Sequence, residues 1–182
     1  MGAVIFKNYH VEDCSEIKKI ADSYKNGVDF GFAMDPATIV RTHYDRKHKR
    51  IYILDEFYKT GLTNDLLAIE IKKMCGYEYV VCDSAEPKSI QELKNLGIAA
   101  LKARKGKDSI LYGIQWLQQQ EIVIDIHCQN TQNEFSQYKW KEDASGNAIP
   151  IPVDKNNHII DALRYAYESE SKSRIEPITA NL

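Results

Sequence analysis

The stretch Asn26-Gly27-Val28-Asp29-Phe30-Gly31-Phe32 places an aspartate among apolar residues, with a glycine two positions away on either side. In an extended chain the side chains alternate, so Asp29 points to the face opposite Val28 and Phe30. The glycines leave room for a ligand to approach the carboxylate. We therefore expect a strand at Val28–Phe32 with a candidate functional acid on its open face.

The segments that follow predict the rest of a sheet. Ala37–Tyr44 and Arg50–Phe57 are the second and third strands of a meander, because Asp45–Lys49 has the composition of a turn. Further strands and helices then alternate along the chain. The expected strands are Tyr79–Cys82, Ile98–Ala103 and Glu121–Ile126, and the expected helices are Asn64–Met74, Pro87–Leu96, Ser109–Leu117 and Thr131–Trp140. This order predicts an α/β fold: a mixed β-sheet of a three-strand antiparallel meander plus parallel strands, with helices on both faces.

The ends of the chain and one hairpin complete the prediction. Val11–Tyr24 has a helical pattern, Lys141–Val153 is typical of a hairpin around Ser145-Gly146-Asn147, and a last helix starts at Asn156 or Asn157. In the Asn64–Met74 helix, Leu66 and Ile69 are expected in the buried stripe together with Leu67, Ala68 and Ile71. We expect a lead-in over residues 1–25, one folded domain over residues 26–170, and a flexible tail over residues 171–182.

Composition excludes several classes of protein. The apolar share of 43% and the charged share of 27% are those of a globular domain, and the net charge of −2 means that any polyanion must be bound by local basic patches. The four cysteines form no Cys-x-x-Cys pair, which argues against a zinc site. Since no run of 18 apolar residues and no signal peptide is present, we expect neither membrane insertion nor secretion by that route.

A second candidate acid, Asp83, follows the short apolar strand Tyr79–Cys82 directly. In open α/β sheets the carboxyl end of a strand borders the ligand crevice. Glu86 lies three residues further on, in the first turn of the next helix. The alternative is purely structural, because Asp83 or Ser84 can cap this helix and Glu86 can complete a capping box.

A third candidate acid, Asp161, lies in the last helix, where His158 shares its face. A solvated helix face has the same pattern, so this motif alone does not decide. Three carboxylates at one place suit Mg²⁺ or Mn²⁺, and two such ions can activate a water and stabilise the leaving oxygen of a phosphodiester. His158 can be a further ligand, position a water or orient Asp161.

Three segments together resemble the nuclease domain of large terminase subunits of tailed phages. They are Gly27-Val28-Asp29-Phe30-Gly31-Phe32, Val81-Cys82-Asp83-Ser84-Ala85-Glu86-Pro87 and Asp154-Lys-Asn-Asn-His158-Ile-Ile-Asp161-Ala-Leu-Arg-Tyr-Ala166. The likeness runs from about Gly27 to Glu168 and is greatest to the type found in phages of Gram-positive bacteria. It implies an RNase H-like, resolvase-like fold and an endonuclease that cuts concatemeric double-stranded DNA during packaging with two divalent metal ions, Mn²⁺ or Mg²⁺.

The resemblance also assigns roles to residues. Asp29, Asp83 and Asp161 are the implied catalytic metal ligands, with His158 as an accessory catalytic ligand and Glu86 as a further candidate ligand. The basic cluster Lys102, Arg104, Lys105 and Lys107 is the best candidate for phosphate contacts, although a solvated loop has the same composition.

The resemblance further implies partners and a setting. A full large subunit carries a packaging ATPase ahead of the nuclease, whereas this chain has no Gly-x-x-x-x-Gly-Lys-Ser/Thr motif. We therefore expect the nuclease domain alone, with residues 1–25 as the end of a linker. The expected partners are double-stranded DNA, the ATPase domain, the portal protein and the small terminase subunit, in the cytoplasm of the infected bacterial host. The alternatives are a Holliday-junction resolvase or RNA–DNA hybrid nuclease of the same fold, and a non-catalytic DNA-binding or motor-docking module.

Overall fold

The computed structural model of the chain describes residues 3–31, 34–104, 106 and 108–172. Within these residues a seven-stranded mixed sheet has the order β1-β7-β4-β3-β2-β5-β6, and β8 and β9 form a separate hairpin. The strands are β1 (Tyr9–Glu12), β2 (Tyr24–Asp29), β3 (Ala37–Asp45), β4 (Arg50–Lys59), β5 (Val80–Cys82), β6 (Ala100–Lys102), β7 (Glu121–Asp125), β8 (Trp140–Glu142) and β9 (Ala148–Pro152).

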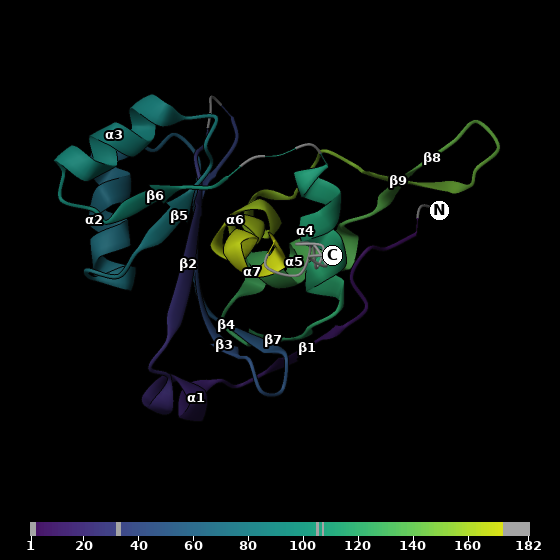
Figure 1. Ribbon diagram of the computed structural model, residues 1–182, viewed down its shortest axis with the longest axis horizontal. Coiled ribbons are helices and arrows are strands. Elements are labelled where there is room, and N and C mark those ends of the chain that lie inside the picture. The colour runs from purple at the N-terminus through teal and green to yellow at the C-terminus, as the bar shows by residue number, and fades with distance from the viewer. Residues whose placement is uncertain (1–2, 32–33, 105, 107, 173–182) are drawn as a thin grey trace, which may run out of the picture.

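Helices cover both faces of this sheet, as Figure 1 shows with the sheet seen nearly edge-on. Helices α2 and α3 lie on one side, α4 to α7 lie on the other, and the β8–β9 hairpin projects away from the body. The helices are α1 (Ser15–Ile20), α2 (Asn64–Cys75), α3 (Pro87–Asn95), α4 (Ser109–Gln118), α5 (Gln129–Gln137), α6 (His158–Ala166) and α7 (Glu168–Lys172). The predicted α/β class, the hairpin and the helix that follows Asn157 are confirmed. None of the helices described is long and apolar enough to cross a membrane.

Most strands of the seven-stranded sheet run in the same direction. Strand β3 pairs antiparallel with β2 and β4, whereas β1–β7, β4–β7, β2–β5 and β5–β6 are parallel pairs. Apart from β3, the strands of this sheet therefore run in one direction and end at the same edge. The predicted meander plus parallel strands is confirmed.

The two faces of the sheet bury separate cores because side chains alternate along each strand. On β3, Val40 packs in the core beneath α4, α5 and α6, and its neighbour Ile39 packs beneath α2 and α3. One expectation about α2 is wrong: Leu66 and Ile69 are 46% and 47% exposed. Successive residues of a helix point about 100° apart, and only one side of α2 faces the sheet. Leu67, Ala68 and Ile71 lie on that side, so Leu66 and Ile69 do not.

The expected helix over Val11–Tyr24 is also wrong. Residues Tyr9–Glu12 form β1 beside β7, the helix spans only Ser15–Ile20, and Tyr24 begins β2. A buried carboxylate on β7 holds this segment, since Asp125 accepts the Cys14 N–H at 3.1 Å and pairs with Lys18 Nζ at 3.1 Å. Such pairing between distant residues overrides the local helical pattern. The role of residues 1–25 as the end of a linker stays a prediction.

Smaller boundaries also differ from the sequence-based expectation. The expected strand Val28–Phe32 is wrong in its bounds, because β2 spans Tyr24–Asp29 and Phe30 and Gly31 lie after its end. Helix α5 ends at Gln137, so Trp140 starts β8 instead of ending that helix. At the end of the chain, Ser171 and Lys172 belong to α7. The remainder of the expected tail, residues 173–182, lies outside the described residues, as does Phe32 at the end of the expected first strand.

Candidate metal centre

Asp29 and Asp83 stand at the ends of two adjacent parallel strands. Val28 on β2 is paired with Cys82 on β5, and the Asp83 N–H donates to the Val28 carbonyl at 3.3 Å. The two acids are the next residues on strands that lie about 4.8 Å apart. Val28 and Cys82 both face the α2–α3 core. Because side chains alternate along a strand, those of Asp29 and Asp83 extend from the opposite face of the sheet, which α6 covers.

Helix α6 can reach these strand ends because β2 carries Gly27. A Cβ at this position would lie 1.8 Å from the carbonyl oxygen of Ala162, so the helix backbone rests directly on the strand backbone. The apolar side chains of α6, among them Ile159, Ile160 and Leu163, are fully buried beside it. This packing holds the polar face of α6, with His158 and Asp161, at the edge where β2 and β5 end.

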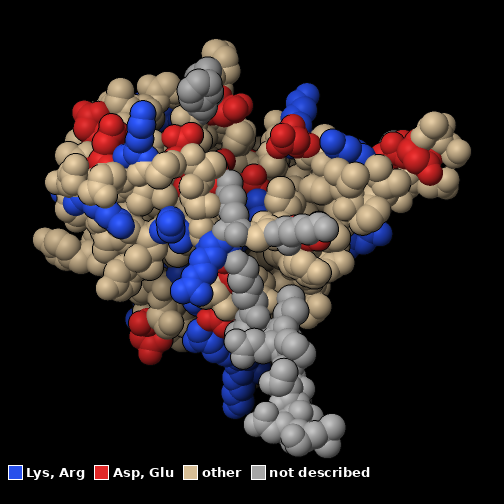
Figure 2. Space-filling view, turned by 45° about the horizontal axis from the view of Figure 1, so that its top comes forward, with Lys and Arg blue, Asp and Glu red and all other residues tan. Residues whose placement is uncertain are grey.

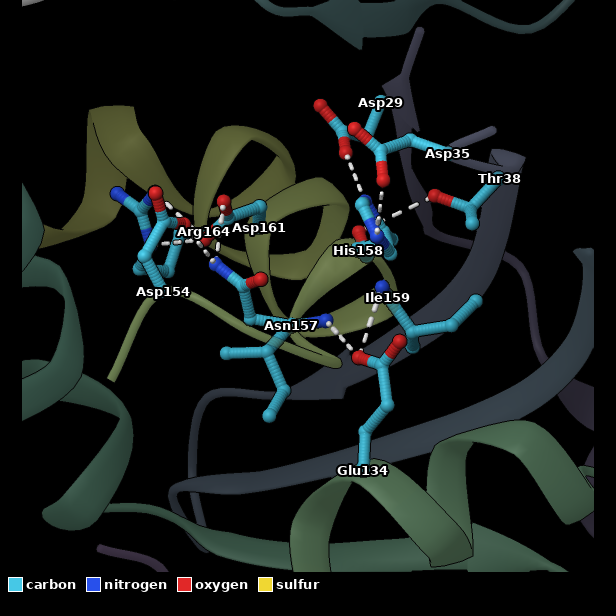
Figure 3. Close-up of polar contacts among 11 residues, drawn as sticks. Asp29, Asp35, Thr38, Glu134, Asp154, Asn157, His158, Ile159, Asp161 and Arg164 are labelled. Atoms are coloured by element: carbon cyan, nitrogen blue, oxygen red, sulfur yellow. Dashed lines mark hydrogen bonds and ion pairs between the residues drawn. The ribbon is translucent and has the colours of Figure 1, made fainter. Parts of the chain in front are cut away.

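His158 contacts two acids on the β2 side of this edge (Figure 3). Its Nδ1 lies 3.2 Å from Asp29 Oδ2, and its Nε2 lies 3.8 Å from Asp35 Oδ1. The backbone of His158 is fixed as well, because Thr38 Oγ1 on β3 donates to its carbonyl at 3.1 Å. Since the hydrogen bond to Asp29 favours the protonated imidazole, the pKa of His158 is raised.

Asp161 is held on both of its oxygens (Figure 3). Arg164 donates to Oδ1 from Nε at 3.1 Å and from Nη2 at 2.8 Å, and Asn157 Nδ2 donates to Oδ2 at 3.1 Å. Asn157 also reaches Asp154 Oδ1 at 3.4 Å. Arg164 is itself buried, and its side chain passes Gly113 of α4, where a Cβ would come within 3.2 Å of it.

Burial raises the pKa values of two acids at this edge, Asp29 and Asp161. The pKa of the Asp29 carboxyl is raised to about 6, chiefly because the group is buried; the hydrogen bond with His158 opposes this shift, and the charges of Asp161 and Asp83 add to it. Burial also raises the pKa of Asp161, against the effect of the Arg164 guanidinium. A buried carboxylate whose ionised form is disfavoured by burial and by neighbouring acids is an electrostatic setting that a divalent cation relieves.

The donor set fits Mg²⁺ or Mn²⁺ in its chemistry, because carboxylate oxygens are the ligands these ions prefer. Its arrangement is not yet that of a metal site. Within the described residues, no group of three or more His, Cys, Asp or Glu side chains is placed to hold one ion. Both oxygens of Asp161 accept hydrogen bonds from Asn157 and Arg164. Ligation of one ion by all three acids therefore requires their side chains to move from these positions.

A pocket of about 380 Å³ opens beside these acids. Asp83, Asp154 and Asp161 line it together with Arg104 and Arg164. Figure 2 shows acidic and basic side chains gathered in the hollow between the α2–α3 layer and the helices of the other face. The pocket can therefore admit a polyanion such as a phosphodiester only where cations or arginines offset its acids.

Of the remaining sequence-predicted residues, Arg104 lines this pocket and Lys102 and Glu86 do not. Lys102 ends β6 beside β5 and is exposed, and the Arg104 N–H donates to Glu168 at 2.6 Å. Lys105 and Lys107 lie outside the described residues. Glu86 precedes α3 as its N-cap residue and lines a different pocket.

Residues that the sequence did not single out complete the centre. Asp154, Asn157 and Arg164 lie inside the third motif, and Asn157 and Arg164 are four and three residues from Asp161, so their contacts with it had a local signal. Asp35 follows Asp29 by six residues and had no such signal. Glu134, described below, had none either, because it reaches the site from another helix.

Comparison with known proteins identifies the family. A family model described as "Terminase RNAseH like domain" matches residues 29–169, a span that contains all three acids. The chain belongs to this family. The RNase H-like fold and the resemblance to terminases predicted from the sequence are thereby confirmed.

Named relatives of this terminase-family domain are phage proteins. The large terminase subunit of Bacillus phage SPP1 is 38% identical over 181 residues, which cover 94% of this chain and 42% of the relative. The PBSX phage terminase large subunit of Bacillus subtilis (strain 168) is 30% identical, covering 92% of this chain and 40% of the relative. The domain thus spans about two fifths of the length of these relatives.

A solved structure matches most of the terminase-family domain. It is the nuclease domain of the large terminase from bacteriophage SPP1, with bound Mn. The TM-score is 0.87 at 36% identity, and the match covers 92% of this chain and 99% of that domain.

Proposed function

We propose that this chain is a metal-dependent endonuclease domain that hydrolyses phosphodiesters of double-stranded DNA. The observation that carries this is the in-register placement of Asp29 and Asp83 at adjacent strand ends, under the helix that bears His158 and Asp161. The family membership and the Mn-bound SPP1 nuclease domain, which is 36% identical, support a metal-binding role for these acids.

Two divalent ions held by Asp29, Asp83 and Asp161 would lower the pKa of an attacking water and stabilise the leaving oxygen. The chain's own residues prepare this site. His158 orients Asp29 through the hydrogen bond to Oδ2, and Arg164 favours the ionised form of Asp161. Phosphate contacts would come from the positive charges of Arg104, which lines the same pocket, and of Lys102, which is exposed at the end of β6.

The longer protein in which this domain would act is a large terminase subunit. The relatives of that name are more than twice as long as the span they share with this chain, which supports a packaging ATPase elsewhere in the protein. We also propose that this longer protein contacts a portal protein and a small terminase subunit. It would act in the cytoplasm of the infected host. The base of the β8–β9 hairpin borders a second pocket of about 240 Å³ that includes Asp161, which supports a role for the hairpin in guiding a DNA strand.

The experiment is cleavage of supercoiled plasmid by the purified chain in Mn²⁺, then in Mg²⁺, with a chelator control. We expect nicking and linearisation that stop when the metal is chelated. A four-way junction and an RNA–DNA hybrid offered beside linear duplex distinguish the other nucleases of this fold. Intact plasmid in both metals, from protein that circular dichroism shows to be folded, would instead favour a non-catalytic module.

A further inference from the structure

The N-terminal turn of α6 is held by a carboxylate from another helix. Glu134 of α5 is 3% exposed, and its Oε2 accepts the backbone N–H groups of Ile159 at 2.9 Å and Ile160 at 3.1 Å (Figure 3). The first N–H groups of a helix lack partners within the helix and are usually satisfied by a capping side chain. The cap residue Asn157 makes no such bond, because its side chain is directed at Asp154 and Asp161.

These two N–H groups lie between the functional side chains of α6. Ile159 follows His158, and Ile160 precedes Asp161. A carboxylate at a helix N-terminus is also favoured by the helix dipole. Glu134 therefore fixes the segment of backbone from which both candidate ligands extend, while Thr38 fixes the same turn from the sheet.

Glu134 is in turn anchored to the sheet. Glu56 of β4 accepts the backbone N–H groups of Asn130 and Thr131, each at 2.8 Å, at the start of α5. Its carboxylate also accepts Asn130 Nδ2 at 2.9 Å and Thr131 Oγ1 at 2.6 Å. One carboxylate thus joins β4 to α5, and a second joins α5 to α6.

We propose that Glu134 is a positioning residue for the metal centre: by holding the first turn of α6 it sets where His158 and Asp161 stand relative to Asp29. This rests on the proposed function, since it concerns the ligands of that metal. The purely structural alternative is a buried carboxylate that stabilises the domain and has no particular effect on the ligands.

Three substitutions of Glu134 separate these roles. Glu134→Gln keeps an oxygen that can accept both N–H groups, Glu134→Asp is too short to reach them, and Glu134→Ala removes the acceptor. Asp125→Ala is the matched control, because Asp125 is a fully buried carboxylate that accepts the N–H groups of Cys14 and His127, away from α6.

The readouts are the Mn²⁺ concentration that gives half of the maximal rise in melting temperature, and kcat and KM for plasmid cleavage. Losing a group that orients a metal ligand typically costs about 10–100-fold in metal affinity or activity. We expect a change of that size in the half-saturating Mn²⁺ concentration and in kcat for the Asp and Ala variants, with KM for DNA unchanged. The Gln variant should restore both values, and Asp125→Ala should lower the melting temperature without altering the Mn²⁺ dependence.

The proposal is overturned if Glu134→Asp or Glu134→Ala folds and binds Mn²⁺ at the wild-type concentration. If neither variant folds while Glu134→Gln does, Glu134 serves folding alone and the proposal also fails. If the wild type neither binds Mn²⁺ nor cuts, the proposed function fails, and amide exchange then decides the positioning claim: equal protection of the Ile159 and Ile160 N–H groups in wild type and in Glu134→Asp would refute it.

Discussion

The close approach of the β2 backbone at Gly27 to the α6 backbone at Ala162 gives the sharpest prediction. In Gly27→Ala the new Cβ would lie 1.8 Å from the Ala162 carbonyl oxygen, whereas real Cβ contacts essentially never fall below 3.0 Å. The difference requires α6 and β2 to separate by at least about 1.2 Å. Neither side of this contact is a flexible side chain, so the helix itself must move.

That displacement acts on stability and on catalysis separately. Overpacking a core typically costs about 1–3 kcal/mol of unfolding free energy. A misplacement of about 1 Å in catalytic groups can cost about 100-fold in rate, or about 2.7 kcal/mol of barrier. His158 and Asp161 move with α6 while Asp29 and Asp83 stay on the sheet, so we expect both losses.

The assay compares Gly27→Ala with Val28→Ala by urea unfolding and by plasmid cleavage in saturating Mn²⁺, below the temperature at which either variant unfolds. Val28 is fully buried in the α2–α3 core, so its truncation should cost roughly 1–2 kcal/mol without moving α6. We expect Val28→Ala to cut at close to the wild-type rate and Gly27→Ala to cut about 100 times more slowly. A folded Gly27→Ala domain that cuts as fast as Val28→Ala would refute this reasoning.

Three further substitutions test other parts of the centre. Asp83→Asn should abolish plasmid cleavage and leave the melting temperature close to that of the wild type. The fold tolerates the change because the amide oxygen can still accept the Ala85 N–H, which lies 2.9 Å from Asp83 Oδ1. Cleavage at the wild-type rate would show that Asp83 is not part of the site. Without metal, the raised pKa of Asp29 contributes stability that is complete below its unfolded value of 3.8 and is lost as the pH rises through about 6. In chelator, the melting temperature of Asp29→Asn should therefore fall less between pH 4 and pH 7 than that of the wild type, and parallel curves would count against the burial argument. Lys102→Ala should weaken DNA binding equally for all sequences and reduce the salt slope by about one, whereas an unchanged slope in a salt titration would exclude a phosphate contact.

The part of the fold that positions the acids was predictable because its signals are local. The apolar run before Asp83 predicts a strand end there, and the alternation around Asp29 predicts a strand that contains this acid, although β2 ends at Asp29 and does not begin near it. Helix α6 was predictable from its apolar stripe, and the spacing of Arg164 from Asp161 is that of neighbours on one helix face. In each case a few consecutive residues carry the information.

The rest depends on contacts between distant residues. Glu134 lies 25 residues before the Ile159 N–H that it binds. Strand β1 forms because it pairs with β7, and Gly27 matters only because α6 lies against it. The exposure of Leu66 follows from which side of α2 meets the sheet, and an apolar residue alone does not reveal that.

The most direct test of the central claim is an anomalous difference map from crystals of this chain soaked in Mn²⁺. We expect peaks between the carboxylates of Asp29, Asp83 and Asp161, with Asp161 turned from Arg164 toward the ion. Peaks elsewhere on the molecule, or none at a Mn²⁺ concentration that supports plasmid cleavage, would contradict it.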